Sequence, residues 1–389
     1  MTKQAATGLP DVTLIGFPLR WTGRAEHVRA VWRALDAAGV TASLYNAGGY
    51  DPNDPRTDTE FLSRVTEHIP PGIRIYSLNG DEVAGVIEAI EAHEPGSFEA
   101  GYNIVFPAWE LPRYPQEWAR QLDRFDEVWT ASPFADASIR PAVTIPVFQL
   151  PNACEPHISE SYGRSHFGIP DGRFVVLFFF DVSSYGTRKN PLAVVEAFRR
   201  FLAVRPFASV QLVIKLNNAP RDRGIVDAIR SQTATLGDRV TIIDATMTTN
   251  EVRNLVRRCD CFVSLHRSEG FGRGPAEAMF FGKPAVATGW SGNMEYMNAD
   301  VSCPVDYSLV PVKSGEYPHG DGQIWADADV GHAAQILVRL IDDPAYARAL
   351  GERARAHMQS SYSDAAIGRR YRARLEAIAR SDGLSSAAR

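Results

Sequence analysis

Short apolar runs alternate with longer amphipathic stretches through the first part of the chain. Val12–Gly16 is one such run, and apolar residues at helical spacing follow it from Gly23 to Ala38. This pattern predicts a unit of strand, loop and helix. Further strands are predicted at Ala42–Tyr45, Arg74–Leu78, Tyr102–Phe106 and Glu127–Ala131. Strands that alternate with helices predict a parallel sheet covered by helices.

The alternation restarts after a connector rich in proline. Prolines recur every five residues from Pro141 to Pro156, which favours an extended segment over a helix. Beyond it, nearly continuous apolar runs predict strands covered on both faces. These runs are Phe174–Phe180, Ser209–Leu216, Val240–Ile243, Cys261–Leu265 and Pro284–Thr288. We therefore predict an α/β protein with two doubly wound Rossmann-like domains, residues 1–160 and residues 161–362.

The C-terminal segment predicts a long amphipathic helix. Ser363 can cap it, and apolar side chains from Ile367 to Ile378 share one face. The polar face carries Arg369, Arg370, Arg372, Arg374 and Arg380. Two interpretations of that face stay open, namely solvation and attraction to anionic lipid.

Composition narrows the class of protein. The 389 residues are 45% apolar and 22% charged, which is ordinary for a soluble globular protein. The net charge of −5 gives no electrostatic case for binding nucleic acid. The four cysteines are too few for a disulfide scaffold, and the first residues lack a signal-peptide core. We expect a cytoplasmic protein whose membrane contact, if it has any, is peripheral.

The segment Arg267–Met279 carries the strongest chemical signal. Glycines at 270, 272 and 274 lie between Glu269 and Glu277. A glycine-rich loop at the start of a helix predicts an anion site, because its backbone amides can turn toward a phosphate. Carboxylates would repel a phosphate, so we assign the two glutamates to sugar hydroxyls. The predicted ligand carries a phosphate and a sugar together.

Other loops that follow predicted strands could complete this site, since ligands bind at the carboxyl ends of parallel strands. The loop after Thr288 contains Ser291, Gly292 and Asn293, whose amides could reach the same diphosphate. Arg188 and Lys189 follow the strand Phe174–Phe180 and could neutralise a diphosphate leaving group. Lys215 ends the strand Ser209–Leu216 and is a further cation.

Several motifs point to no additional chemistry. Asp327 and Asp329 have the spacing of a metal-binding pair, but no further ligand set accompanies them, so we predict no metal. Cys259 and Cys261 lack zinc spacing and are predicted to be buried thiols. The loop after Val12–Gly16 lacks the glycine spacing of a nicotinamide dehydrogenase.

For other residues two roles remain open. His266 could orient a substrate or make a structural hydrogen bond. Glu110, next to Trp109, could act on an acceptor hydroxyl or cap its segment. The segment Tyr307–Trp325 could form a loop that selects the acceptor or an ordinary surface excursion.

Together these features resemble retaining, nucleotide-sugar-dependent glycosyltransferases of GT-B architecture. The spacing Glu-x7-Glu from Glu269 to Glu277, the loop Gly289–Asn293 and the sequence Arg188-Lys189-Asn-Pro carry the resemblance in the second half. In the first half, Tyr102-Asn-Ile, Trp109-Glu-Leu-Pro and 126–134 resemble bacterial members that build O-antigen, capsular and related glycans.

The resemblance implies a role for each donor-side residue. Glu277 would hold the donor ribose and Glu269 the hydroxyls of the transferred sugar, while Arg188 and Lys189 would stabilise the departing diphosphate. Backbone amides would assist at Gly270, Phe271, Gly272, Ser291, Gly292 and Asn293. Ala245 and Thr246 would lie near the base.

The resemblance also implies an acceptor side in the first domain, at Thr22, Gly23, Trp109 and Glu110, and a helix within 363–389 that crosses back to that domain. Two positions differ from many relatives. Asp181-Val-Ser-Ser-Tyr stands where they carry an arginine, and Trp109-Glu110 stands where they carry a histidine.

The activity implied is metal-independent and retaining transfer, without a cofactor, from a nucleoside diphosphate sugar to a glycan or lipid-linked acceptor. GDP-mannose is the first donor to consider, against UDP- and dTDP-sugars. Two alternatives remain open: a nucleotide-sugar epimerase on the same fold, and a non-catalytic partner that binds sugar nucleotides.

Overall fold

The computed structural model describes residues 9–49 and 57–381. They divide into two compact units. The first unit comprises the residues up to Trp109, Arg113–Cys154 and the residues from Ser360, and the second comprises Glu110–Pro112 and Glu155–Gln359. The predicted boundaries at 160 and 362 fall slightly later along the chain than these. No sequence pattern indicates the short excursion at Glu110–Pro112.

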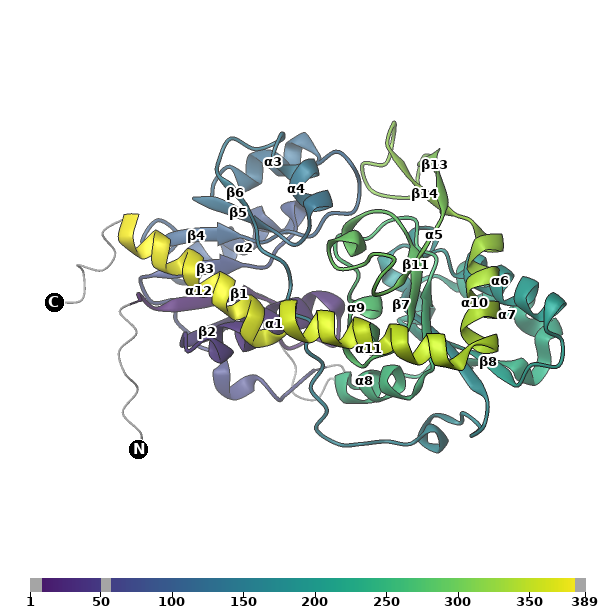
Figure 1. Cartoon of the computed structure of the whole chain (residues 1–389). Coiled ribbons are helices and arrows are strands. Elements are labelled where there is room, and N and C mark those ends of the chain that lie inside the picture. Colours follow the sequence, from purple (N-terminus) through teal and green to yellow (C-terminus); the bar gives the residue numbers. More distant parts are fainter. Residues whose placement is uncertain (1–8, 50–56, 382–389) are drawn as a thin grey trace. The chain divides into compact units, whose positions relative to one another are not determined.

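The described part of the first unit contains a parallel sheet of six strands in the order β2-β1-β3-β4-β5-β6 (Figure 1). The strands are β1 (Val12–Gly16), β2 (Ala42–Asn46), β3 (Ile73–Tyr76), β4 (Tyr102–Val105), β5 (Glu127–Thr130) and β6 (Val147–Gln149). β6 lies inside the segment that we predicted as a connector. It has three residues between Pro146 and Pro151 and forms an edge of the sheet, where prolines are tolerated.

Five α-helices belong to the described part of this unit. They are α1 (Gly23–Ala37), α2 (Gly80–His93), α3 (Gln116–Leu122), α4 (Pro133–Ile139) and the C-terminal α12 (Asp364–Ser381). α12 packs along α1 in the first unit (Figure 1). A Cβ atom at Gly368 would lie 1.9 Å from the Ala34 carbonyl oxygen, so the close approach of the two helices requires glycine there. The expected return of the chain to its first domain is confirmed.

The arginine-rich face of α12 is partly used inside the first unit. Arg374 donates to the fully buried carboxylate of Glu127 (3.1 Å), and its guanidinium lies over the Phe148 ring. Arg372 donates to Glu376 (2.8 Å) and to the Ala38 carbonyl oxygen (3.0 Å). Only the remaining three arginines of this face are exposed. The charge available to an external partner is therefore smaller than the sequence suggests.

The second unit also contains a parallel sheet of six strands, in the order β9-β8-β7-β10-β11-β12. Its strands are β7 (Phe174–Asp181), β8 (Val210–Asn217), β9 (Val240–Ile243), β10 (Cys261–Ser264), β11 (Ala285–Thr288) and β12 (Cys303–Val305). This is the doubly wound order, in which the direction of winding reverses between β7 and β10.

Helices cover both faces of this sheet. Phe178 and Phe180 pack with α6 (Pro191–Val204), α7 (Arg223–Thr233), α10 (Val330–Asp342) and α11 (Pro344–Ser361). Val175 and Leu177 point to the other face, where they pack with α8 (Thr249–Arg258) and α9 (Arg273–Phe280). Because neighbouring residues face opposite ways, a strand covered on both sides must be apolar throughout. An antiparallel hairpin, β13 (Tyr307–Pro311) and β14 (Ile324–Ala328), occupies the predicted excursion.

The prediction of buried thiols is confirmed. All four cysteines are buried free thiols, including Cys259 and Cys261. Among the described residues, no helix has the length and apolarity needed to cross a bilayer.

Candidate active site

Three of the predicted loops meet at one edge of the second sheet. β10 lies between β7 and β11, and the three strands are parallel, so the loops that follow them emerge side by side. The loop after β7 contains Arg188 and Lys189, that after β10 contains Glu269–Gly272, and that after β11 contains Ser291–Asn293. Since the winding reverses between β7 and β10, their carboxyl ends are the place where such sheets bind ligands.

The loop after β7 is held in place by backbone contacts. It forms the short helix α5 (Gly186–Lys189), bounded by Tyr185 and Asn190, which both have positive φ. Asn190 Nδ2 donates to the Leu265 carbonyl oxygen (3.0 Å), and the Arg267 amide donates to the Arg188 carbonyl oxygen (2.7 Å). These bonds fix the two cations against the loop after β10.

Arg188 is almost fully buried, and its guanidinium is bonded on several sides. Nη1 donates to the Ser268 carbonyl oxygen (2.9 Å) and to Glu269 Oε2 (3.3 Å), and Nη2 donates to the Ser184 carbonyl oxygen (3.1 Å). Burial disfavours its charge, but the carboxylates of Glu110 and Glu269 outweigh burial and raise the pKa. Arg188 therefore stays cationic at every working pH.

Glu269 joins the two cations. Lys189 Nζ forms an ion pair with Glu269 Oε1, while Arg188 contacts the other carboxylate oxygen. Burial alone would raise the pKa of Glu269, but Lys189 and Arg188 together lower it to about 2. The carboxylate is therefore ionised near neutral pH and acts only as a hydrogen-bond acceptor.

Glu110 and Tyr317 complete this cluster within the second unit. Glu110 Oε1 lies 3.7 Å from Arg188 Nη2, and the Tyr317 hydroxyl donates to Glu110 Oε2. Tyr317 comes from the segment between β13 and β14, and its ring lies against that of Tyr185. The predicted excursion thus folds back onto the cation pair. No spacing in the sequence indicates Tyr317.

The glycine loop contains a close backbone contact. A Cβ atom at Gly292 would lie 2.0 Å from the Gly270 carbonyl oxygen, which excludes any other residue there. The Gly292 amide donates to the Glu269 carbonyl oxygen (2.8 Å), and the Glu269 amide donates to Ser291 Oγ (2.9 Å). The prediction that the Gly292 amide binds a phosphate must be corrected, because this amide already donates to the Glu269 carbonyl oxygen of the neighbouring loop.

His266 and Asn293 form a buried scaffold beneath the loops. Asn293 Nδ2 donates to the Thr288 carbonyl oxygen (2.9 Å), so Asn293 Oδ1 accepts from His266 Nε2 (3.0 Å). The other ring nitrogen of His266 then accepts from the Ser264 hydroxyl (3.0 Å). Burial lowers the pKa of His266 to about 4 and keeps the ring neutral. Of the two roles left open for His266, the structure favours the structural one.

The other residues of the glycine segment lie on or beside α9. Gly272 has a φ of 83° and precedes the first residue of the helix. Phe271 is buried, with its ring against Tyr296. Glu277 accepts from Arg273 one helical turn earlier (3.1 Å). Phe271 thus has a packing role, while Glu277 is held by a neighbouring cation.

Three more predicted donor residues lie at the same sheet edge, on or just after strands farther from β10. They are Lys215, Ala245 and Thr246. Lys215 is on β8, where burial lowers its pKa to about 8. Ala245 and Thr246 are exposed in the loop between β9 and α8. No hydrogen bond or ion pair joins these three described residues to Arg188 or Lys189. They remain candidates for the base end of an extended ligand.

The predicted acceptor residues of the first unit have separate environments. Thr22 accepts from the Ala25 amide (3.2 Å) as the cap of α1, and Gly23 is its exposed first residue. Both follow β1, at the carboxyl edge of that sheet. Trp109 is only 1% exposed and packs edge-on against Tyr114 and Trp118. This burial corrects the prediction that Trp109 lines an acceptor site.

Asp327 and Asp329 have structural partners, which accounts for their spacing. Asp327 pairs with Arg267 (3.1 Å), and Asp329 accepts from the Gly331 and His332 amides at the start of α10.

Comparison with known proteins adds independent information. A structure of HepE from Anabaena with UDP-glucose matches with a TM-score of 0.68 at 14% identity, covering 95% of this chain and 100% of that one. Sucrose-phosphate synthase from Thermosynechococcus elongatus matches with a TM-score of 0.66 at 18% identity, over 95% and 98% of the two chains. A glycosyltransferase from Rickettsia africae matches with a TM-score of 0.66 at 13% identity, over 96% and 99%.

These structural likenesses show that the chain has the GT-B fold. No curated protein sequence matches it significantly. Residues 164–357, which make up nearly all of the second unit, match the family model of glycosyl transferases group 1. The second unit therefore belongs to the glycosyl transferases group 1 family.

Proposed function

We propose that this protein is a retaining glycosyltransferase that moves a sugar from a nucleoside diphosphate sugar to an acceptor hydroxyl. The observation that carries the proposal is the pair of buried Arg188 and partly buried Lys189, joined to Glu269 where the winding of the second sheet reverses. A departing diphosphate needs fixed positive charge, and a sugar needs acceptors for its hydroxyls. The cluster supplies both within a few ångströms.

Donor binding rearranges the ion pairs of this cluster. Phosphate oxygens take over contacts of Arg188 and Lys189, and the Glu269 carboxylate accepts hydrogen bonds from the sugar. Glu277 holds the ribose. The low pKa of Glu269 supports this division of roles, because the group cannot be protonated by the phosphate or by the buffer near pH 7. Arg188 and Lys189 thus exchange contacts with a carboxylate for contacts with phosphate, and each keeps an anionic partner throughout.

The reaction proceeds on one face of the sugar. The bond between the anomeric carbon and the phosphate oxygen breaks while the acceptor oxygen bonds to the same face of that carbon. The proton of the acceptor hydroxyl passes to the leaving phosphate oxygen. Arg188 and Lys189 stabilise the negative charge that develops there, so catalysis is mainly electrostatic and positional. In this proposal these fixed cations do the work that a divalent metal does at other phosphate sites.

The donor is a nucleoside diphosphate hexose. The family resemblance makes GDP-mannose the first donor to consider, while the HepE structures that resemble this chain contain UDP or UDP-glucose. At 14–16% identity that likeness does not choose between them. We therefore keep GDP-mannose and UDP-glucose as the first two donors to test. The acceptor proposed is a glycan or a lipid-linked glycan of a bacterial cell surface.

Thermal denaturation of the full chain with GDP, UDP and dTDP identifies the base first, because a bound nucleotide raises the melting temperature. The matching donor is then incubated alone and with candidate acceptors, and the product is examined by NMR. Transfer with the anomeric configuration kept supports the proposal. Conversion of the donor sugar without an acceptor indicates an epimerase, binding without turnover indicates a non-catalytic partner, and an inverted product refutes retention.

Lys189→Ala and Lys283→Ala provide a matched pair for this assay. Both lysines belong to the second unit, but Lys283 precedes β11 at the amino edge of the sheet. Loss of turnover in both variants would mean that the cation pair has no special role.

A further inference from the structure

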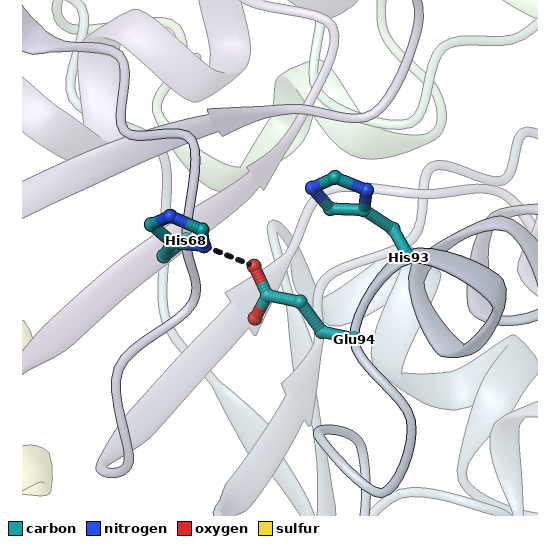
Figure 2. Close-up of side chains that lie close together, drawn as sticks. All are labelled: His68, His93 and Glu94. Carbon is teal, nitrogen blue, oxygen red and sulfur yellow. Dashed lines mark hydrogen bonds and ion pairs between the residues drawn. The ribbon is translucent and has the colours of Figure 1, made fainter.

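Two histidines and a glutamate come together on the first unit. They are His68, His93 and Glu94, and one ligand atom from each lies within 4.8 Å of the other two. Figure 2 shows the two imidazoles around the Glu94 carboxylate. Among the described residues, no other group of three metal-ligating side chains meets this geometry. Neither histidine belongs to any motif that the transferase function uses.

The backbone presents these side chains from two ordered elements. His93 is the last residue of α2, and Glu94 is its C-cap. His68 lies in the segment that leads into β3, where Thr66 Oγ1 donates to the His68 carbonyl oxygen (2.8 Å) and accepts from the His68 amide (3.2 Å). The Thr66 amide in turn donates to the Leu44 carbonyl oxygen of β2 (2.8 Å). The His68 segment is therefore anchored to the sheet, and the other two residues are held at the end of a helix.

Glu94 is oriented toward the imidazoles. Its Oε2 accepts from the Ile69 amide (3.2 Å), and its Oε1 lies 3.0 Å from His68 Nδ1. One oxygen of the carboxylate is thus held by the backbone, and the other is directed at His68. Outer hydrogen bonds of this kind orient the ligands of known metal sites.

The donor set suits zinc. Two imidazole nitrogens and one carboxylate oxygen are zinc ligands, with bonds of about 2.0–2.2 Å, and a fourth tetrahedral position can take water. Ligand atoms around such an ion lie roughly 3.3 Å apart by tetrahedral geometry. The present separations of up to 4.8 Å must close by about 1.5 Å, which a rotation of exposed side chains can provide. The His68 side chain is 82% exposed, and the rings of His68 and His93 are almost parallel.

The helix end adds a favourable field. The C-terminus of α2 carries a partial negative charge from its unpaired carbonyl groups, which attracts a cation next to His93 and Glu94. Two surface imidazoles without such neighbours would attract a cation less strongly.

We propose that His68, His93 and Glu94 bind a zinc ion that ties the segment before β3 to the end of α2. The site lies in the first unit, whereas Arg188, Lys189 and Glu269 lie in the second. The role proposed for the ion is to stabilise the first unit. This inference stands whether or not the proposed transferase activity is confirmed.

Calorimetric titration of the metal-stripped, tag-free full chain with zinc chloride at pH 7.5 tests the proposal. We expect one ion per chain. His93→Ala and Glu94→Gln should each weaken zinc binding by at least about tenfold, since losing even an outer contact of a metal site costs about that much. His68→Ala provides a second imidazole variant. The two histidines are exposed and glutamine keeps the size of the partly buried Glu94, so circular dichroism should show unchanged folding.

His166→Ala is the matched control. His166 Nε2 also lies beside a carboxylate, Glu251 (3.3 Å), but in the second unit and outside the three-residue group. Zinc binding should be unchanged in this variant, and zinc should raise the melting temperature of wild type and His166→Ala but not of His93→Ala. The proposal is overturned if wild type binds no zinc, or if His93→Ala and Glu94→Gln bind it as tightly as wild type does.

Discussion

Replacing Glu269 with glutamine removes the negative charge that joins Arg188 and Lys189 while keeping the size of the side chain. In the wild type the carboxylate contacts both cations, and its side chain is only 12% exposed. In the variant the two cations keep their mutual repulsion and lose their shared counter-ion. Because all three groups are screened from water, we expect a large loss of folding stability near neutral pH.

The pKa of Glu269 gives the size of this effect. It falls from an ordinary value of 4.5 to about 2, and one unit of pKa corresponds to about 1.4 kcal/mol. The folded state therefore favours the ionised carboxylate by about 3 kcal/mol relative to the unfolded state. Since the folded pKa is the lower one, this contribution is complete above pH 4.5 and is lost as the pH falls toward 2. At pH 7, Glu269→Gln should lower the free energy of unfolding by about 3 kcal/mol.

Urea unfolding of the full chain at pH 7, followed by circular dichroism, measures this loss in the transition of the second unit. Glu352→Gln is the control, because Glu352 is exposed on α11 and its replacement should change stability by less than about 0.5 kcal/mol. The difference between wild type and Glu269→Gln should shrink between pH 4.5 and pH 3. If Glu269→Gln is as stable as Glu352→Gln at pH 7, the charge balance inferred for the cluster is wrong.

Other predictions concern function, packing and the surface. Lys189→Ala should lower kcat/KM for transfer by about a hundredfold or more, measured as nucleoside diphosphate release, while Lys283→Ala stays near wild type; equal rates would contradict the leaving-group role. Glu277→Gln should weaken donor binding by about tenfold in calorimetry, since a neutral amide oxygen replaces the charged acceptor of the hydrogen bond, and an unchanged Kd would remove the ribose role. Asn293→Leu should lower the free energy of unfolding by about 1–3 kcal/mol in urea, because the buried His266 Nε2–H loses its acceptor; an unaltered midpoint would count against the scaffold. Co-sedimentation with anionic vesicles should show no salt-sensitive binding, because two arginines of α12 make ion pairs inside the first unit, whereas salt-sensitive pelleting would support a membrane role.

Local pattern was enough to place most of the strands. Runs covered on both faces, such as β7, are apolar along their whole length and stand out from the helical segments around them. The pattern failed for β6 and β12, which have three residues each, lie at sheet edges and contain or adjoin proline. An edge strand needs only one partner, so it can be short and carry residues that a central strand excludes.

Residue types and their spacing also indicated the cation pair and the glycine loop. These residues directly follow buried strands, and ligands bind at the carboxyl ends of such strands. Only the tertiary structure decided how these groups are used. It places Arg188 and Lys189 beside Glu269, which lies about 80 residues later in the chain. It also pairs the Gly292 amide with the Glu269 carbonyl oxygen. It also buries Trp109 and gathers His68 with His93 and Glu94.

The physical reason for this division is the range of the interactions. Periodicity and turn chemistry act over a few residues, so the sequence by itself determined the α/β class, the order of the elements and the types of side chain at each strand end. Hydrogen-bond partners, ion pairs and burial depend on which distant segments the sheet order places side by side. For this protein the sequence therefore indicated a phosphate and sugar site, and the fold decided which of its charges and amides are already paired.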